Sequence, residues 1–263
     1  MKIKFLLLVF VLFFCSKVFA INLTLYFGYE NLFWKEINDS GRTILTEKGF
    51  AASPGIRFTI LKRKVSFKGS FDLFLAPSMN YNGETMEGIP VTTKNLWIGI
   101  RWNSGISYEF LRWKYLSFSF SLDLGGMNWI RKLNSTTLSN GTFVSGYTEI
   151  WESLYLDTSL KAFWWYKKVK FSIGIYGIYP CYTINKADLP DVEAVLLRLK
   201  GKISPGLEVG IKVYNFELMW FYREYSFKKS NTVVVQGYSG DYYGIWQPGS
   251  LFRIQGIKVS YSF

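Results

Sequence analysis

The residues best suited to chemistry in this sequence are carboxylates, because the chain contains no histidine. Imidazole titrates near neutral pH, and the Ser-His and Asp-His arrangements of hydrolases depend on it. The usual imidazole ligands of zinc are also missing, so we expect neither a metal nor a cofactor. Two aspartates, Asp72 and Asp123, occupy equivalent positions of a repeated pattern, and such a pair could share a proton and act as acid and base.

The same polar face carries cations that could neutralise these carboxylates. A buried charge is costly unless a partner lies beside it, so ion pairing is the favoured role and catalysis the less favoured one. The further acidic residues of this face are Glu109, Asp157, Glu208 and Glu217, and its basic residues are Lys68, Arg101, Lys161, Lys170, Lys212 and Arg223. The expected charge network consists of Asp72, Arg101, Glu109, Asp123, Asp157, Lys161, Lys212 and Arg223.

Apolar residues occur at every second position through much of the chain, which is the period of a strand with two different faces. Between 96 and 110 the apolar face consists of Leu96, Ile98, Ile100, Trp102, Ile106, Tyr108 and Phe110. The odd positions between them include Arg101, Ser107 and Glu109. Segment 116–124 repeats the pattern and places Asp123 on the polar face. The sequence therefore predicts long amphipathic strands.

Short and long connections alternate between these strands. Tight turns, most of them basic, are expected at 61–64, 111–114, 166–168 and 213–216, and long polar loops near 35–50, 77–94, 126–147, 180–194 and 227–247. Strands of roughly nine to eleven residues suffice to cross a bilayer when tilted. The pattern predicts an all-β, antiparallel, up-and-down transmembrane barrel of about ten strands, with short periplasmic turns and five extracellular loops.

A secreted soluble β-sandwich or lipocalin-like barrel is the competing architecture, with its apolar face inside. The polar face is rich in serine, glycine and isolated charges such as Arg101 and Asp157. Those residues suit a crowded lumen better than an open surface, which favours the membrane barrel.

The N-terminal segment has the form of a secretory signal peptide. Lys2 and Lys4 precede an apolar run, and Val18-Phe19-Ala20 supplies a cleavage signal. We expect removal of residues 1–20 and a single barrel domain over 21–263. A lipoprotein signal at Cys15 is less favoured, because Phe14 stands where a small residue is needed. The formal net charge of +12 in the full chain lies mostly at turns, so nucleic-acid binding is not expected.

Aromatic residues beside the turns are expected to form a girdle at the membrane interface, because tryptophan and tyrosine concentrate there in outer-membrane barrels. The lower girdle is assigned to Tyr108, Phe110, Trp113, Trp164 and Tyr166. Members of an upper girdle are sought among Trp34, Trp129, Trp151, Trp220 and Tyr222.

The last strand alternates Ile257, Val259, Tyr261 and Phe263 with polar or small residues. This ending resembles the C-terminal strand signature of bacterial outer-membrane proteins. The resemblance implies recognition by the barrel-assembly machinery, an outer-membrane location among lipid and lipopolysaccharide, and two periplasmic termini. The ten-strand plan also resembles the omptins, which are surface proteases, but their Asp-His motif has no counterpart here.

The expected function is therefore that of a non-enzymatic outer-membrane barrel with a structural or surface-interaction role carried by its loops. A narrow, porin-like channel for small solutes is one alternative, and bilayer conductance would reveal it. An omptin-like surface hydrolase using lumen carboxylates is another, and it requires Asp72 and Asp123 to act together.

Overall fold

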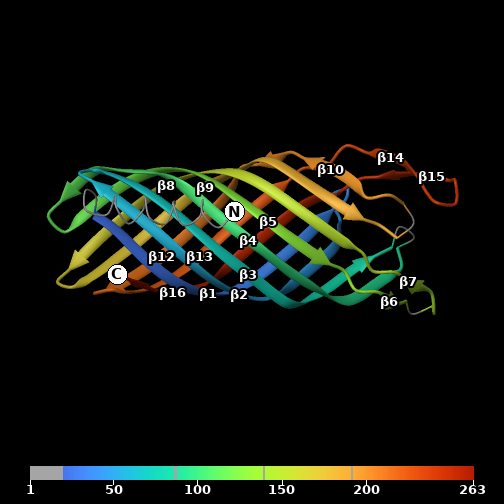
Figure 1. The fold of residues 1–263 in the computed structure, drawn as a ribbon, viewed down its shortest axis with the longest axis horizontal. Helices are drawn as coiled ribbons and strands as arrows, with labels where there is room; N and C mark the ends of the chain where they lie inside the picture. The colour runs from blue at the N-terminus through green and yellow to red at the C-terminus, as the bar shows by residue number, and fades with distance from the viewer. Residues whose placement is uncertain (1–19, 86–87, 139, 191) are drawn as a thin grey trace, which may run out of the picture.

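The computed structural model describes residues 20–85, 88–138, 140–190 and 192–263 of the chain. The predicted signal peptide therefore lies outside the described residues, except for Ala20, where the first strand begins. No helix within the described ranges is long and apolar enough to cross a membrane. Figure 1 shows one elongated body of tilted strands, with tight turns at one end and longer excursions at the other.

Ten long strands surround a single lumen in the described chain. They are β1 (Ala20–Ile37), β2 (Thr43–Lys62), β3 (Val65–Glu84), β4 (Pro90–Trp113), β5 (Leu116–Lys132), β8 (Thr148–Tyr166), β9 (Val169–Asp188), β12 (Ser204–Val213), β13 (Phe216–Phe227) and β16 (Gly249–Ser262). Two short strands, β10 (Val195–Leu199) and β11 (Gly201–Lys202), continue the line of β12 towards the loop end. Two small hairpins project from loops: β6 (Thr136–Thr137) with β7 (Phe143–Val144), and β14 (Val233–Gln236) with β15 (Tyr242–Ile245).

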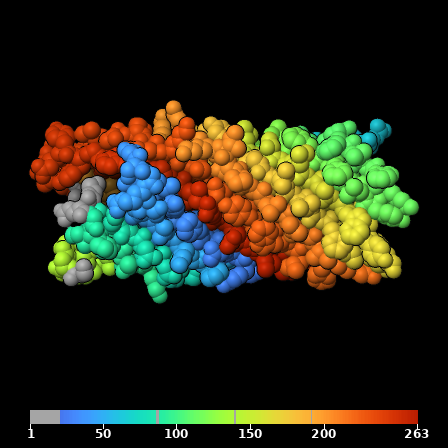
Figure 2. Space-filling model, turned by 180° about the vertical axis from the view of Figure 1, so that it is seen from behind, coloured from blue at the N-terminus to red at the C-terminus, as the bar shows by residue number. Residues whose placement is uncertain are grey.

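The sheet closes because the last strand pairs with the first. β16 is antiparallel to β1, with Ile257 opposite Tyr29, and on its other side it pairs with β13. In Figure 2 the red C-terminal strand runs between the blue and orange segments. Closure leaves no open sheet edge, as a sheet that spans lipid requires. The predicted closed antiparallel barrel of ten strands is confirmed.

The two faces of the strands point as the sequence predicts. On the outside, Ile98 is 46% exposed and Leu122 is 51% exposed, whereas on the inside Arg101 is 8% exposed and Asp123 is 2% exposed. A soluble barrel with its apolar face inside is wrong for this chain, because the apolar face covers the exterior.

The four predicted tight turns are confirmed, and each has the same backbone signature. Arg63, Lys114, Lys167 and Tyr214 take positive φ values of 57°, 37°, 54° and 54°. Two-residue hairpins of the type that matches strand twist require this left-handed conformation, which Gly and Asn adopt most easily. None of these four positions is occupied by either residue.

The strands extend further than predicted, so the predicted loop boundaries are wrong. The loop expected over 35–50 shrinks to 38–42 between β1 and β2, and β4 alone has 24 residues. In the strand segments that fall within the predicted loops, several outward residues are polar, for example Lys48, Lys132 and Lys186, and polar residues are typical of loops. A strand of 20 residues tilted by about 40° rises about 50 Å, roughly twice a 25 Å apolar band.

Closure can be tested at Val259, which lies opposite Phe27 of β1 and Leu218 of β13. The substitution Val259→Pro removes an N–H from the seam, and an unpaired backbone group in lipid costs several kcal/mol. We expect the wild-type protein to migrate differently on a gel before and after boiling, and the variant to lose that difference. Val234→Pro in the loop hairpin β14 is the matched control and should keep it. An unchanged gel shift in Val259→Pro would show that the seam is not needed for the folded barrel.

Candidate functional site

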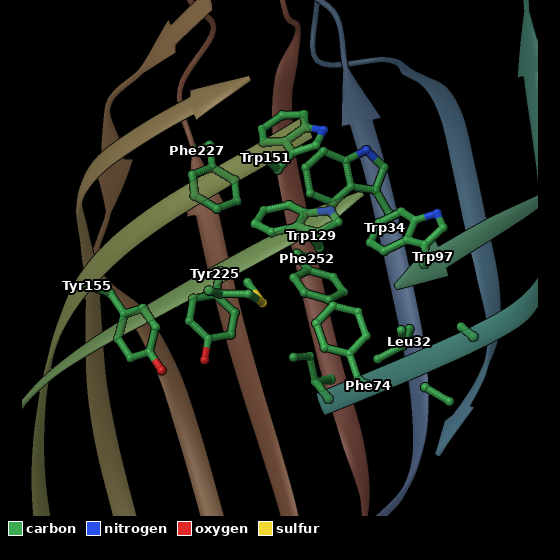
Figure 3. Close-up of a cluster of buried hydrophobic side chains, with 14 of the residues drawn as sticks. Leu32, Trp34, Phe74, Trp97, Trp129, Trp151, Tyr155, Tyr225, Phe227 and Phe252 are labelled. Carbon is green, nitrogen blue, oxygen red and sulfur yellow. The ribbon is translucent and has the colours of Figure 1, made fainter. Parts of the chain in front are cut away.

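The lumen is filled near the loop end by a cluster of large rings, here called the aromatic plug (Figure 3). Its members are Trp34, Trp97, Trp129, Trp151, Phe227 and Phe252, each at most 1% exposed. They come from β1, β4, β5, β8, β13 and β16, so six of the ten strands contribute a ring. The plug is part of a larger buried apolar cluster that also includes Leu32, Phe74 and Ile178.

The plug spans the full width of the lumen. Trp34 lies on β1 and Trp151 on β8, which are five strands apart in a ring of ten and therefore face each other. Their ring centroids are only 4.9 Å apart, in an edge-to-face arrangement. Trp151 also stacks on Trp129 at 5.3 Å, and Trp34 packs near Phe227 at 6.2 Å. Rings from opposite walls are therefore in contact at this level.

Three of the candidates for an upper girdle, Trp34, Trp129 and Trp151, do not belong to it, because all three are buried inside. The alternation of side chains along β5 already predicts that Trp129 points inwards. Asp123 faces the lumen, and Trp129 is six residues further along the same strand, on the same side. Trp220 faces outwards and is exposed, as are the residues assigned to the lower girdle: Tyr108, Phe110, Trp113, Trp164 and Tyr166.

Next to the plug lies a buried ionic group, here called the Arg131 cluster, which consists of Arg131, Glu36, Glu47 and Glu149. The guanidinium lies 2.6 Å from a Glu47 oxygen, 2.8 Å from Glu149 and 3.4 Å from Glu36. Arg131 is on β5, whereas Glu36 and Glu47 are on β1 and β2. These ion pairs therefore also cross the lumen.

Three indoles of the plug bind this cluster. The Nε1–H groups donate to carboxylate oxygens in three pairs, which are Trp34 to Glu36 at 2.9 Å, Trp97 to Glu47 at 2.7 Å and Trp151 to Glu149 at 2.8 Å. A hydrogen bond to a charged acceptor is stronger than a neutral one. Each carboxylate is thus held by the arginine and by one tryptophan, so the plug and the cluster form a single unit.

A second ionic group occupies the middle of the barrel. Arg101 Nε lies 2.6 Å from Asp72, and its terminal nitrogens lie 2.8 Å from the carboxylate of Glu30. The hydroxyl of Tyr26 donates to Asp72 at 2.8 Å. Lys258 is 3.7 Å from the same aspartate. Sequence reasoning placed Asp72 and Arg101 together on one face but missed Glu30.

The remaining residues of the expected network lie nearer the turn end. Lys161 is 2.6 Å from Glu208, and Arg223 is 3.4 Å from the same carboxylate. Lys68 is 2.8 Å from Asp123. These contacts are the pairing that the sequence favoured over catalysis.

Three expected members of the network behave differently. Glu109 lies outside the buried groups and pairs with Arg112 beside a turn. Lys212 donates to the hydroxyl of Ser262 at 2.9 Å. Within the described chain, no cation lies within ion-pair distance of the buried carboxylate of Asp157.

Asp72 and Asp123 do not form a proton-sharing pair. Each has its own cation, and β4 with Arg101 separates their strands. The described residues also contain no cluster of acidic or thiol side chains that could hold a metal ion. The arrangement neutralises charge and fills space.

On the turn side of the plug the lumen contains a cavity of about 660 Å³, lined in part by these ion pairs. Arg63, Lys64 and Arg112 line it at the turn end, and Tyr155 and Tyr225 at its inner end, next to the plug. One wall is formed by β5, whose serine hydroxyls have no partner among the described residues: Ser117, Ser119 and Ser121. The lumen thus contains a packed aromatic cluster towards the loops and a cavity towards the turns.

Comparison with known proteins identifies the fold and nothing finer. No protein-family model matches the chain, and no curated protein matches it. The outer membrane protease OmpT from Escherichia coli is structurally similar, with a TM-score of 0.58 and 10% identity over 93% of this chain and 98% of OmpT. Weaker similarities are to a mutant of the monoaromatic hydrocarbon channel TodX (TM-score 0.39, 9% identity, 92% and 90% coverage) and to Neisserial surface protein A (0.33, 10%, 91% and 97%). The chain therefore has the fold of a ten-stranded outer-membrane barrel.

The Arg131 cluster generates a stability prediction. Arg131→Leu leaves three buried carboxylates without their cation, and removing one partner of a buried ion pair typically costs about 3–5 kcal/mol. We expect the free energy of unfolding, measured by urea denaturation in micelles, to fall by about that amount. The control is Arg253→Leu, which removes an exposed ion pair with Glu224 and should cost at most about 1 kcal/mol. Equal losses in the two variants would contradict a structural role for the cluster.

Proposed function

We propose that this protein is an integral outer-membrane β-barrel that neither conducts solutes nor catalyses a reaction, and that acts through its loop end as a structural or surface-interaction protein. The observation that carries the proposal is the contact between Trp34 and Trp151 across the lumen. A lumen blocked by interlocked rings favours a scaffold over a pore. The loops are then the part of the molecule that can bind a partner.

The outer surface supports the membrane location. Large apolar side chains are exposed on every wall of the barrel, for example Leu25, Leu73 and Ile173. A soluble protein rarely exposes apolar surface on this scale. Lipid chains would cover this face, and lipopolysaccharide would surround the loop end. The barrel-assembly machinery would read the final strand at Ile257, Val259, Tyr261 and Phe263.

A narrow channel is the second candidate, and the cavity of about 660 Å³ at the turn end favours it. A pore needs open space along the whole lumen, and this cavity supplies it at the turn end only. Conduction would require the aromatic plug to move, and the Arg131 cluster opposes that movement because each indole hydrogen bond must break first. A hydrolase using Asp72 and Asp123 has less support, since separate cations neutralise the two carboxylates.

Planar-bilayer recording distinguishes the scaffold from the channel. We expect the refolded wild-type protein to give flat current traces, because the plug spans the lumen. The double variant Trp34→Ala with Trp151→Ala removes the two rings that meet across it, and we expect it to conduct. Tyr238→Ala, in the exposed last loop, is the control and should stay silent. Steady single-channel currents from the wild-type protein would contradict the proposal.

Orientation can be tested by cysteine labelling on intact cells. In a Cys181→Ser background, a cysteine replaces either Tyr238 at the loop end or Tyr214 at the turn end, both of which are well exposed. A membrane-impermeant maleimide should label the first variant and spare the second. The reverse labelling pattern would place the turns outside the cell. If neither cysteine is labelled, even in lysed cells, the two positions are not exposed.

A further inference from the structure

The tight turns have a feature that hairpin geometry does not require. Arg63, Lys114 and Lys167 hold left-handed backbone conformations with φ between 37° and 57°. For residues with a Cβ atom this conformation costs roughly a kcal/mol, and Gly or Asn would adopt it more easily. Unfavourable backbone conformations persist mostly where a function needs the side chain. Three turns therefore keep a cation at some cost in backbone energy.

The turn end as a whole is strongly basic. Segments 61–64, 111–115, 166–169 and 213–216 contain seven lysines and arginines and no acidic residue. At the other end, acidic and basic residues are mixed in the connecting segments, for example Asp39 with Arg42 and Asp241 with Lys228 and Lys229. The turn end is therefore the more uniformly basic of the two ends. Its charge is complementary to an anionic surface.

Most of these cations have no carboxylate partner. Arg112 pairs with Glu109 at 2.8 Å. Across the described ranges, no carboxylate lies within 4.0 Å of Arg63, Lys64, Lys114, Lys167 or Lys168. All five are exposed. Their charge is therefore available to an external anion.

Exposed aromatic rings lie between the cations. Trp113 is 75% exposed beside Lys114, whose Nζ lies 5.1 Å from the ring centre of Tyr115. Lys167 Nζ lies 5.5 Å from the ring centre of Tyr166. Rings of this kind sit at the level of lipid headgroups, with their polar edges towards water. A soluble anionic ligand would need the cations but not these rings.

We propose that the turn end of the barrel binds the headgroups of anionic phospholipids in the adjacent leaflet. The cations of the turns contact the phosphates, and Trp113 and its aromatic neighbours anchor among the headgroups. This proposal rests on the proposed membrane location. It adds a lipid preference that the barrel fold alone does not supply.

Tryptophan quenching by brominated lipids tests the proposal. The protein is reconstituted into vesicles of phosphatidylcholine and phosphatidylglycerol, with one or the other lipid brominated, and the ratio of their association constants is measured. The quenching at the turn end is isolated by subtracting the signal of Trp113→Phe. We expect the wild-type protein to prefer phosphatidylglycerol several-fold, and 0.5 M NaCl to weaken that preference through screening.

The test variant combines Arg63→Asn, Lys114→Asn and Lys167→Asn. Asparagine tolerates the left-handed conformation, so the turns are kept while three charges are lost. A cation near an anionic surface contributes about fivefold in binding, so the ratio should fall towards one. Tyr214→Asn changes the fourth turn in the same way without changing the charge, and it should keep the wild-type ratio.

The outcomes separate this proposal from the proposed function. A wild-type ratio of one, or an unchanged ratio in the triple variant, overturns the lipid preference while leaving the membrane barrel intact. An equal loss in Tyr214→Asn assigns the effect to turn structure and also overturns it. Absence of quenching by either lipid means that the protein is not inserted, and the proposed function then fails as well.

Discussion

The constraint on which this structure depends is the narrow interior of a ten-stranded barrel. Every second residue of each long strand points into it, and water has little room to solvate the charges that arrive there. Most of the buried charges therefore pair with a residue on another strand, although Asp157 has no cation beside it in the described chain. Arg131 pairs with Glu47 at 2.6 Å and Arg101 with Glu30 at 2.8 Å. These contacts fix the distances between walls that only the closed sheet brings together.

The two ends of the lumen meet this constraint in different ways. Towards the loops, tryptophans fill the space, and their indole N–H groups donate to the carboxylates that surround Arg131. Towards the turns, the walls carry serines and separate ion pairs around a cavity of about 660 Å³. Because the rings are hydrogen-bonded to the charges, neither layer can rearrange alone.

The errors of sequence interpretation also follow from the interior. Tryptophan was assigned to the membrane surface because barrels concentrate it there, yet Trp34, Trp129 and Trp151 fill the lumen. Trp129 lies on the same strand as Asp123 at an even spacing, so strand alternation places it inside. Alternation therefore predicts the side of Trp129 correctly, whereas the enrichment of tryptophan on barrel surfaces does not. The strand segments near the loop end resemble loops in sequence because outward residues such as Lys48 and Lys132 are polar. Beyond the apolar band, the outward side chains of a strand can be polar.

The sequence by itself determined the strands, their faces, the turns and the order of pairing, because a period of two and a tight turn are local properties of the chain. It placed Asp72, Asp123 and Arg101 inside for the same reason. Only the tertiary structure decided the partners. Arg131 and Glu36 are 95 residues apart, and Trp34 meets Trp151 across the lumen. Such contacts depend on the diameter and stagger of the closed sheet, which no single strand encodes.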